Sequence, residues 1–273
     1  MLLAMLALVG AAVGVIGTLV GAGGGFLVVP ILVLGLSVQP SLAAGTSLVV
    51  VTANAVVGTA AHGLRGRVDW PAGLFLAVAS YPGSLLGAWL GPRIRADLLT
   101  LGFGVLLILL ALWMAYRIFQ ESRQEAATAE PRRPAPHGPI RMIRRLPLPR
   151  GKSYTFTFDI PIAVAGSLVI GLLGGLLGIG GGPLLVPFLI FGLNYPAHVA
   201  AATSQLNIAL TSFGAALVYL LQGSLIPSYA VALSAGVIVG SPLGAWLATR
   251  IKARILVWMM AGILLFLGLR LAL

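Results

Sequence analysis

Two glycine runs are the residues of this sequence best placed to bind a ligand. GAGGG occupies 21–25 and GIGGG occupies 178–182, and each run is followed, after four further residues, by a proline. Glycine lets a chain leave a helix without steric cost. The helix that restarts beyond the run offers free N–H groups and a positive dipole end to an anion. We therefore predict that a small anion is bound by Gly23, Gly24, Gly25, Gly180, Gly181 and Gly182.

The glycine runs also have other interpretations. Small residues allow helices to pack closely, and this alternative stays open for both runs. Inside a membrane, non-helical backbone is tolerated only where protein buries it or where it lines a polar cavity. A nucleotide-binding loop is excluded, because neither run is followed by Lys-Ser or Lys-Thr and neither follows a strand pattern.

Uncharged polar residues follow each glycine run. On the helix expected over 41–62, Ser47, Asn54 and His62 recur at helical spacing and share one face with Gly58. Inside a bilayer, such residues either line a permeation path or bond neighbouring helices, for about 0.6–2 kcal/mol per contact. Because the helix expected over 198–221 carries a similar set, we favour the path. Its expected lining is Thr46, Ser47, Asn54, Thr203, Ser204, Gln205, Asn207 and Thr211.

Acidic residues are missing from the middle of every expected span. The three aspartates and three glutamates lie at segment ends or in the central loop. Pumps and cation antiporters place a carboxylate within the membrane, so an anionic or neutral substrate is favoured. His62 and His198 are candidates for proton transfer or gating, with an interfacial position as the alternative. The sequence has no nucleophile–base pair and no metal-ligand cluster, and it predicts neither an enzyme nor a bound cofactor or metal.

The composition is that of an integral membrane protein. Of 273 residues, 59% are hydrophobic and 8% are charged, against about 25% charged in soluble domains. The absence of cysteine excludes a disulfide-built secreted scaffold. Nine of the 17 basic residues fall in 117–152, which is typical of a cytoplasmic loop and could allow contact with anionic lipid. No nucleic-acid-binding motif accompanies the net charge of +11.

The chain contains an internal duplication. Residues 14–116 align without a gap with residues 171–273 at a constant offset of 157, and 35 of the 103 pairs are identical. Each half holds a first span, a glycine run, an eleven-residue apolar piece and three longer apolar segments. A membrane crossing needs about 20 residues, so we expect the eleven-residue pieces to be half-helices or re-entrant arms.

These segments predict an all-α polytopic integral membrane protein of about 8–10 membrane segments. The first repeat is 1–117, the second is 159–273, and 118–158 is a basic cytoplasmic linker expected to be an irregular, water-exposed loop. Each repeat has four full spans and the short piece. If the short piece does not cross the membrane, the two repeats are parallel. In that case 12 basic residues lie on the cytoplasmic side and five on the outer side. If the short piece does cross, the repeats are inverted, and 14 basic residues lie on the cytoplasmic side and three on the outer side. Charge favours inversion, whereas the length of the short pieces favours the parallel arrangement. Taken together, the inverted relation is slightly favoured.

At these residues the sequence resembles the TauE/SafE family of sulfite-exporter-like permeases. The resemblance rests on GAGGGFLVVP and GIGGGPLLVP, on the Thr-Ser pairs at 46–47 and 203–204, and on the GSxLGAWL blocks at 83–90 and 240–247. It implies a bacterial or archaeal inner-membrane permease that exports small sulfur-containing anions, such as sulfite or organosulfonates. We expect the anion to be held near the midplane, where the glycine runs meet. The alternative is a non-transporting membrane scaffold or lipid-interacting protein, and the oligomeric state is left open.

Overall fold

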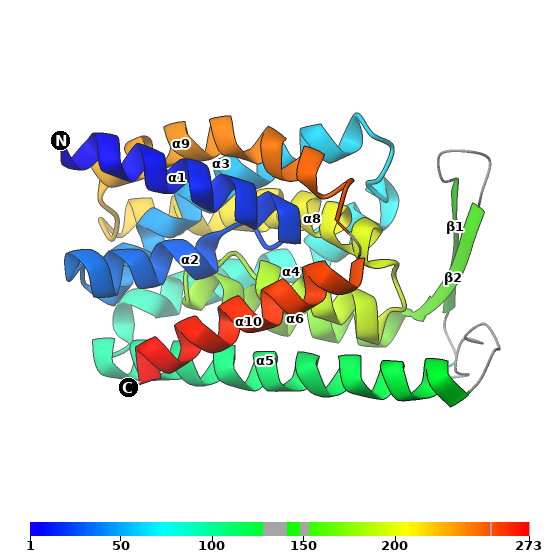
Figure 1. Cartoon of the computed structure of the whole chain (residues 1–273). Helices are drawn as coiled ribbons and strands as arrows, with labels where there is room; N and C mark the ends of the chain where they lie inside the picture. The colour runs from blue at the N-terminus through cyan, green and yellow to red at the C-terminus, as the bar shows by residue number, and fades with distance from the viewer. Residues whose placement is uncertain (128–140, 148–152, 252, 273) are drawn as a thin grey trace.

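The computed structural model describes all residues except 128–140, 148–152, 252 and 273, and most of the described chain is a bundle of helices (Figure 1). Six described helices are long and apolar enough to cross a membrane. They are α1 (Leu2–Val20), α3 (Pro40–Gly63), α4 (Trp70–Leu90), α5 (Ala96–Ala127), α8 (Ala197–Leu221) and α9 (Pro227–Leu247). The bundle also contains α6 (Ile160–Leu176), α10 (Ala253–Ala272) and the 3-10 turn η2 (Gly91–Arg93). The expected all-α polytopic membrane protein is confirmed.

Each half also contains a helical arm that is too short to cross a membrane. In the first half, α2 (Gly25–Pro30) continues into the π-helical turn η1 (Ile31–Gly35). In the second half, α7 (Gly182–Pro187) continues into η3 (Phe188–Gly192). Each change from α to π follows the proline, because its ring leaves no N–H to bond the preceding turn. The expected half-helices therefore begin directly at the glycine runs.

The linker contains regular structure that the sequence analysis did not predict. Helix α5 continues to Ala127, since residues 118–127 are rich in good helix formers. Strand β1 (Arg141–Pro147) pairs antiparallel with β2 (Ser153–Asp159) in a hairpin. Strand β2 alternates Ser or Thr with aromatic residues, a composition that favours extended chain. The expectation of an irregular loop throughout 118–158 is therefore wrong for these segments.

Glycine permits close helix packing at two equivalent interfaces, with α1 running parallel to α9 and α6 parallel to α4. A Cβ added at Gly240 would lie 2.0 Å from the carbonyl oxygen of Ala11. One added at Gly83 would lie 2.2 Å from the carbonyl oxygen of Leu168. The two contacts are related by the offset of 157 residues. The helices thus approach backbone to backbone, as is common where small residues line a membrane-helix interface.

Helices at equivalent positions of the two halves cross each other antiparallel. In the α3–α8 pair, Gly45 packs against Tyr219 and Gly58 against Gln205, so one chain rises as the other descends. Helices α5 and α10 also run in opposite directions (Figure 1). Equivalent helices are antiparallel when the two halves are related by a two-fold axis perpendicular to the helices. Parallel repeats would place equivalent helices parallel to each other.

Counting the arm, each half makes an odd number of passes through the bundle, although the arm is too short to cross a membrane by itself. Helix α1 leaves one end of the bundle, and the arm α2–η1 returns toward that end, where α3 begins (Figure 1). Helices α3, α4 and α5 then cross in turn, and the second half repeats the path in reverse. We infer inverted repeats. Both termini lie at one end, here called the terminal end, and the loop 64–69 and the start of α6 lie at the other, here called the linker end (Figure 1).

The inverted arrangement predicts the orientation of the protein. Three of the 17 basic residues, Arg93, Arg95 and Arg270, belong to the terminal end. The positive-inside rule therefore predicts a cytoplasmic linker end. Green fluorescent protein inserted at position 135 should fluoresce, and alkaline phosphatase fused to the C-terminus should be active outside. Fluorescence from reporters at both positions would contradict inversion.

The backbone contact between α9 and α1 predicts a strong response to one methyl group. Gly240→Ala should lower the free energy of unfolding in detergent by about 1–3 kcal/mol, the usual cost of overpacking. The matched control is Gly102→Ala in α5, where no atom lies within 4 Å of the added Cβ. There alanine should be neutral or stabilising by up to about 1 kcal/mol. Equal stability of the two variants would disprove close packing at Gly240.

Candidate functional site

The two glycine breaks, residues 21–25 and 178–182, contact each other inside the bundle. A Cβ added at Gly25 would lie 2.8 Å from the Cα of Ile179, and one added at Gly182 would lie 2.2 Å from the carbonyl oxygen of Ala22. The two contacts are equivalent under the offset of 157, so the breaks face each other across the internal two-fold axis. Gly24 and Gly181 immediately precede the arms and have φ of 83° and 77°, a conformation that side-chain-bearing residues rarely adopt.

Backbone hydrogen bonds close each turn but leave donors at the start of each arm. The carbonyl oxygen of Gly17 accepts from the N–H groups of Ala22, at 2.9 Å, and Gly23, at 3.2 Å, and the second break repeats the pattern through Gly174. Within the described residues, no backbone carbonyl accepts from the N–H groups of Gly24, Gly25, Phe26, Gly181 and Gly182. Free N–H groups at the start of a helix, together with the positive dipole end, can bind an anion.

Asn54 connects the first break to three helices. This residue of α3 is fully buried. Its side-chain amide donates to the carbonyl oxygen of Gly23, at 2.9 Å. Its side-chain oxygen accepts from the hydroxyl of Thr18 in α1, at 2.8 Å, and from the hydroxyl of Ser241 in α9. Through these three hydrogen bonds, Asn54 holds the turn in place beside the N–H groups that lack a backbone acceptor.

Helix α8 reaches the same break from the other half of the chain. The hydroxyl of Ser204 donates to the carbonyl oxygen of Gly21. The amide of Gln205 donates to the carbonyl oxygen of Gly17, at 3.2 Å. The side-chain oxygen of Gln205 is buried and has no hydrogen-bond partner among the described residues. The structure therefore brings Asn54, Ser204 and Gln205 together at the first break.

Other residues of the expected lining make contacts away from the breaks. The hydroxyls of Thr46 and Thr203 hold the chain before α9 and α4, accepting from the N–H groups of Ile226, at 2.9 Å, and Asp69, at 3.1 Å. The amide of Asn207 donates to the hydroxyl of Ser80, at 2.9 Å. These three residues join helices and loops, which is the alternative that the sequence left open.

The second break lacks the polar anchor of the first. Thr211 is the residue equivalent to Asn54, but its hydroxyl donates to the carbonyl oxygen of Asn207 in its own helix, at 2.9 Å. Ser47 is buried there without a hydrogen-bond partner among the described residues. Ser212 is also unpartnered, and a Cβ at Gly180 would lie 2.5 Å from its hydroxyl.

Sequence reasoning missed three residues of the site, Thr18, Ser241 and Ser212. Thr18 is the single polar residue of α1, and Ser241 lies in the repeated GSxLGAWL block. Both features were signals that could have found them. Ser212 lies beside Thr211 without a distinguishing pattern.

The two histidines lie at different depths. Nε2 of His62 is 3.4 Å from the carbonyl oxygen of Thr18, so this ring lies one helical turn from the first break. Asn54, Gly58 and His62 share one face of α3 toward Thr18, as predicted. His198 lies in the first turn of α8, at the linker end. Of the two histidines in the described part of the chain, His62 is the one that adjoins the break.

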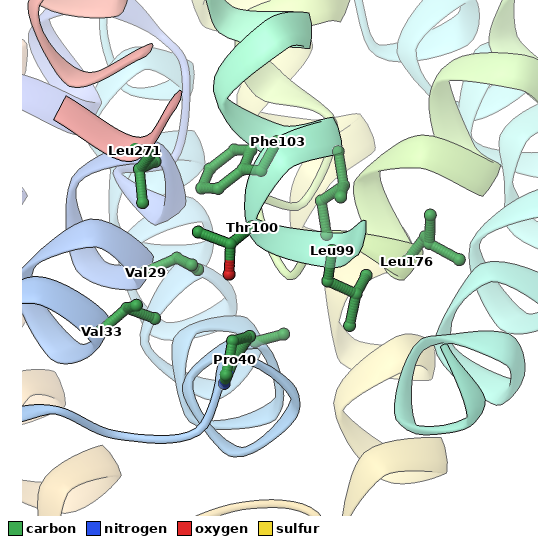
Figure 2. Close-up of a pocket in the computed structure, with 10 residues that line it drawn as sticks. Val29, Val33, Pro40, Leu99, Thr100, Phe103, Leu176 and Leu271 are labelled. Carbon is green, nitrogen blue, oxygen red and sulfur yellow. The ribbon is translucent and has the colours of Figure 1, made fainter. Parts of the chain in front are cut away.

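The described cavities are apolar and lie beside the breaks. A narrow crevice is lined by residues of the arm, α3, α5, α6 and α10 (Figure 2), and a second lies at the equivalent position. Figure 2 shows Val29, Val33, Phe103 and Leu271 around the first, with the Thr100 hydroxyl as the side-chain oxygen in view. Walls of this kind do not suit an anion. We therefore place the candidate site at the breaks and not in these crevices.

The chain is similar to proteins described as membrane transporters. The family model described as sulfite exporter TauE/SafE matches residues 6–271. The probable membrane transporter protein YunE of Bacillus subtilis is 32% identical over 271 residues, covering 97% of this chain and 95% of the relative. A probable membrane transporter protein of Methanocaldococcus jannaschii is 31% identical over 228 residues, covering 81% of this chain and 73% of the relative. No solved structure matches the chain.

The difference between the two breaks predicts unequal effects of two matched substitutions. Asn54→Leu removes the anchor of the first break and leaves the carbonyl oxygen of Gly23 unsatisfied, so reconstituted transport should fall at least tenfold. Such a fall corresponds to about 1.4 kcal/mol, which the loss of the three buried hydrogen bonds of Asn54 is enough to supply. Thr211→Val at the equivalent position removes only a bond within its own helix and should change transport less than threefold, or about 0.65 kcal/mol. Equal effects of the two variants would contradict a special role for Asn54.

Proposed function

Because the chain belongs to the sulfite exporter TauE/SafE family, we propose that it exports a small sulfur-containing anion, such as sulfite or an organosulfonate. It is a membrane transporter by family and by its relatives. The proposed location is the inner membrane of a prokaryote, with the linker end in the cytoplasm. The proposed activity is transport without covalent chemistry.

The observation that carries this proposal is the contact between the two breaks. Two arm N-termini, each with N–H groups lacking a backbone acceptor, meet inside a membrane-spanning bundle. Discontinuous helices that point their N-termini at a substrate are a recurring arrangement in transporters. The described aspartates lie at helix ends, away from this contact. The breaks thus favour negative charge over a cation.

We assign roles to the residues around this contact. Backbone N–H groups of Gly24, Gly25, Gly181 and Gly182 bind the oxygen atoms of the anion. Asn54, Ser204 and Gln205 hold the first break and line the approach to it. The breaks touch in this structure, so the anion passes when the two arms separate.

The energetics need no coupling ion. An inside-negative membrane potential favours the exit of an anion by about 2.3 kcal/mol per charge per 100 mV. The described spans contain no carboxylate in their middle that would carry a proton or sodium ion. His62 beside the first break is the group through which a proton-coupled alternative would act.

The proposal predicts sulfite flux through proteoliposomes that contain the purified chain. An inside-negative potential set by valinomycin should accelerate efflux, and sodium should have no effect. Gly24→Val and Gly181→Val should abolish the flux, because valine does not adopt positive φ and would fill the contact. The control is Gly262→Val, where no atom lies within 4 Å of an added Cβ.

Three outcomes would contradict the proposal. Full flux in both the Gly24→Val and the Gly181→Val variants would show that the anion is not bound at the breaks. Efflux that ignores the potential but follows a pH gradient, and loses that response in His62→Ala, would favour proton coupling. No flux of sulfite, sulfate or thiosulfate would favour a non-transporting scaffold or lipid-interacting protein.

A further inference from the structure

Unpartnered polar atoms gather between the first break and the linker end. Five buried side-chain atoms without a hydrogen-bond partner among the described residues lie on the last turns of α3, on the first turns of α8 and in the loop 64–69. They are Oγ1 of Thr59, Nδ1 of His62, an Nη atom of Arg67, Nδ1 of His198 and Oε1 of Gln205. Buried polar groups usually find partners, so this concentration needs an explanation.

Arg67 is the charged member of this group. The ion pair found among the described residues, Arg95–Asp97, lies at the terminal end, and Arg67 forms none. Burial, together with the charge of Arg65, lowers the pKa of Arg67 from its usual range. Arg67 lies within electrostatic range of both His198 and His62. A half-buried guanidinium without a counter-charge is unfavourable, and a bound anion would relieve that cost.

The position of Arg67 is fixed by the loop around it. The N–H group of Asp69 donates to Thr203, and its buried carboxylate accepts from the hydroxyl of Tyr195, at 3.3 Å. Val68 packs against Ala202 in α8. These contacts attach the loop to the first turns of α8, so Arg67 is held within electrostatic range of His198 by the protein itself.

The terminal end shows the opposite arrangement. Tyr219 occupies the position equivalent to His62, and its hydroxyl donates to the carbonyl oxygen of Leu176, at 3.1 Å. The Cβ position of Gly91 lies 2.0 Å from that hydroxyl, so the space is filled. The cation nearby, Arg93, donates to Gln222 and stacks over Trp89. Among the described residues, four serines outside this group also have unpartnered hydroxyls, but the unpaired arginine and the unpartnered histidines gather toward the linker end, which supports an anion site there.

We propose that Arg67 and His198 form an entry site that binds a small tetrahedral or pyramidal oxyanion at the linker end, before it reaches the first break. The planar guanidinium pairs two N–H groups with two oxygen atoms, and His198 supplies a second polar contact. From there, His62 and Gln205 lead to Thr18, Asn54 and the free N–H groups of the first break. The path rests on the proposed transport function, whereas the site itself does not.

Equilibrium binding tests the site directly. The full chain, in nanodiscs of uncharged phosphatidylcholine, is titrated with radiolabelled sulfite and, separately, with radiolabelled sulfate. Arg67→Gln should weaken binding at least tenfold, as expected for a lost charge-assisted bond. Arg67→Lys should retain part of the affinity, and His198→Gln should weaken it less than Arg67→Gln. The control is Arg65→Gln, whose guanidinium already donates to the carbonyl oxygen of Ala61 and whose loss should change affinity less than threefold.

Transport measurements distinguish a failure of the proposed entry site from a failure of the proposed transport function. In proteoliposomes, Arg67→Gln should raise the half-saturating anion concentration at the linker end and leave the rate at saturation within twofold. Unchanged binding and half-saturation in a correctly folded Arg67→Gln protein would overturn the entry site, even if the wild type transports. Arg67-dependent binding by a wild type that moves no anion would support the site and overturn the proposed transport. Equal loss in Arg65→Gln and Arg67→Gln would indicate general surface charge and would also overturn the site.

Discussion

Backbone groups that leave a helix inside a membrane must find partners there, and this constraint shapes the protein around its two glycine breaks. Each break is covered by the other, through the contacts of Gly25 with Ile179 and Gly182 with Ala22. The contact requires the arms to approach from opposite ends, which the antiparallel relation of the two halves supplies. The same small residues that allow the breaks to meet leave N–H groups without backbone acceptors, and these are the groups that we propose bind the anion.

The two halves share a backbone plan but differ in their polar side chains. The first break is held by Asn54, Ser204 and Gln205, while Thr211 at the position equivalent to Asn54 bonds its own helix. At the ends of the bundle, His62 is replaced in the second half by Tyr219, which fills its surroundings. We interpret this asymmetry as the basis of direction. In our proposal the anion enters at the linker end through Arg67 and His198, whereas at the terminal end Tyr219 fills the equivalent position.

The sequence predicted the parts of the fold that repeat. The glycine runs, the short arms and the long spans recur at one offset, and α2 and α7 begin at equivalent residues. The sequence did not predict which hydroxyls reach the breaks. Helical spacing gives the face of a residue but not its partner, so Thr46 and Thr203 were expected in the path although they hold loops. The hairpin β1–β2 was missed because its pattern is short, and Arg67 because a single arginine in a loop carries no periodic signal.

Crystallography with an anomalous scatterer can test whether an oxyanion binds where the two breaks meet, as we propose. Selenite has the charge and pyramidal shape of sulfite and can be located by the anomalous signal of selenium. In crystals grown with selenite, we predict an anomalous peak between the arms, within hydrogen-bonding distance of the N–H groups of Gly24 or Gly181. A peak at Arg67 as well would be consistent with entry from the linker end. Selenium at other positions only, in crystals in which the two arms have separated, would contradict binding at the breaks.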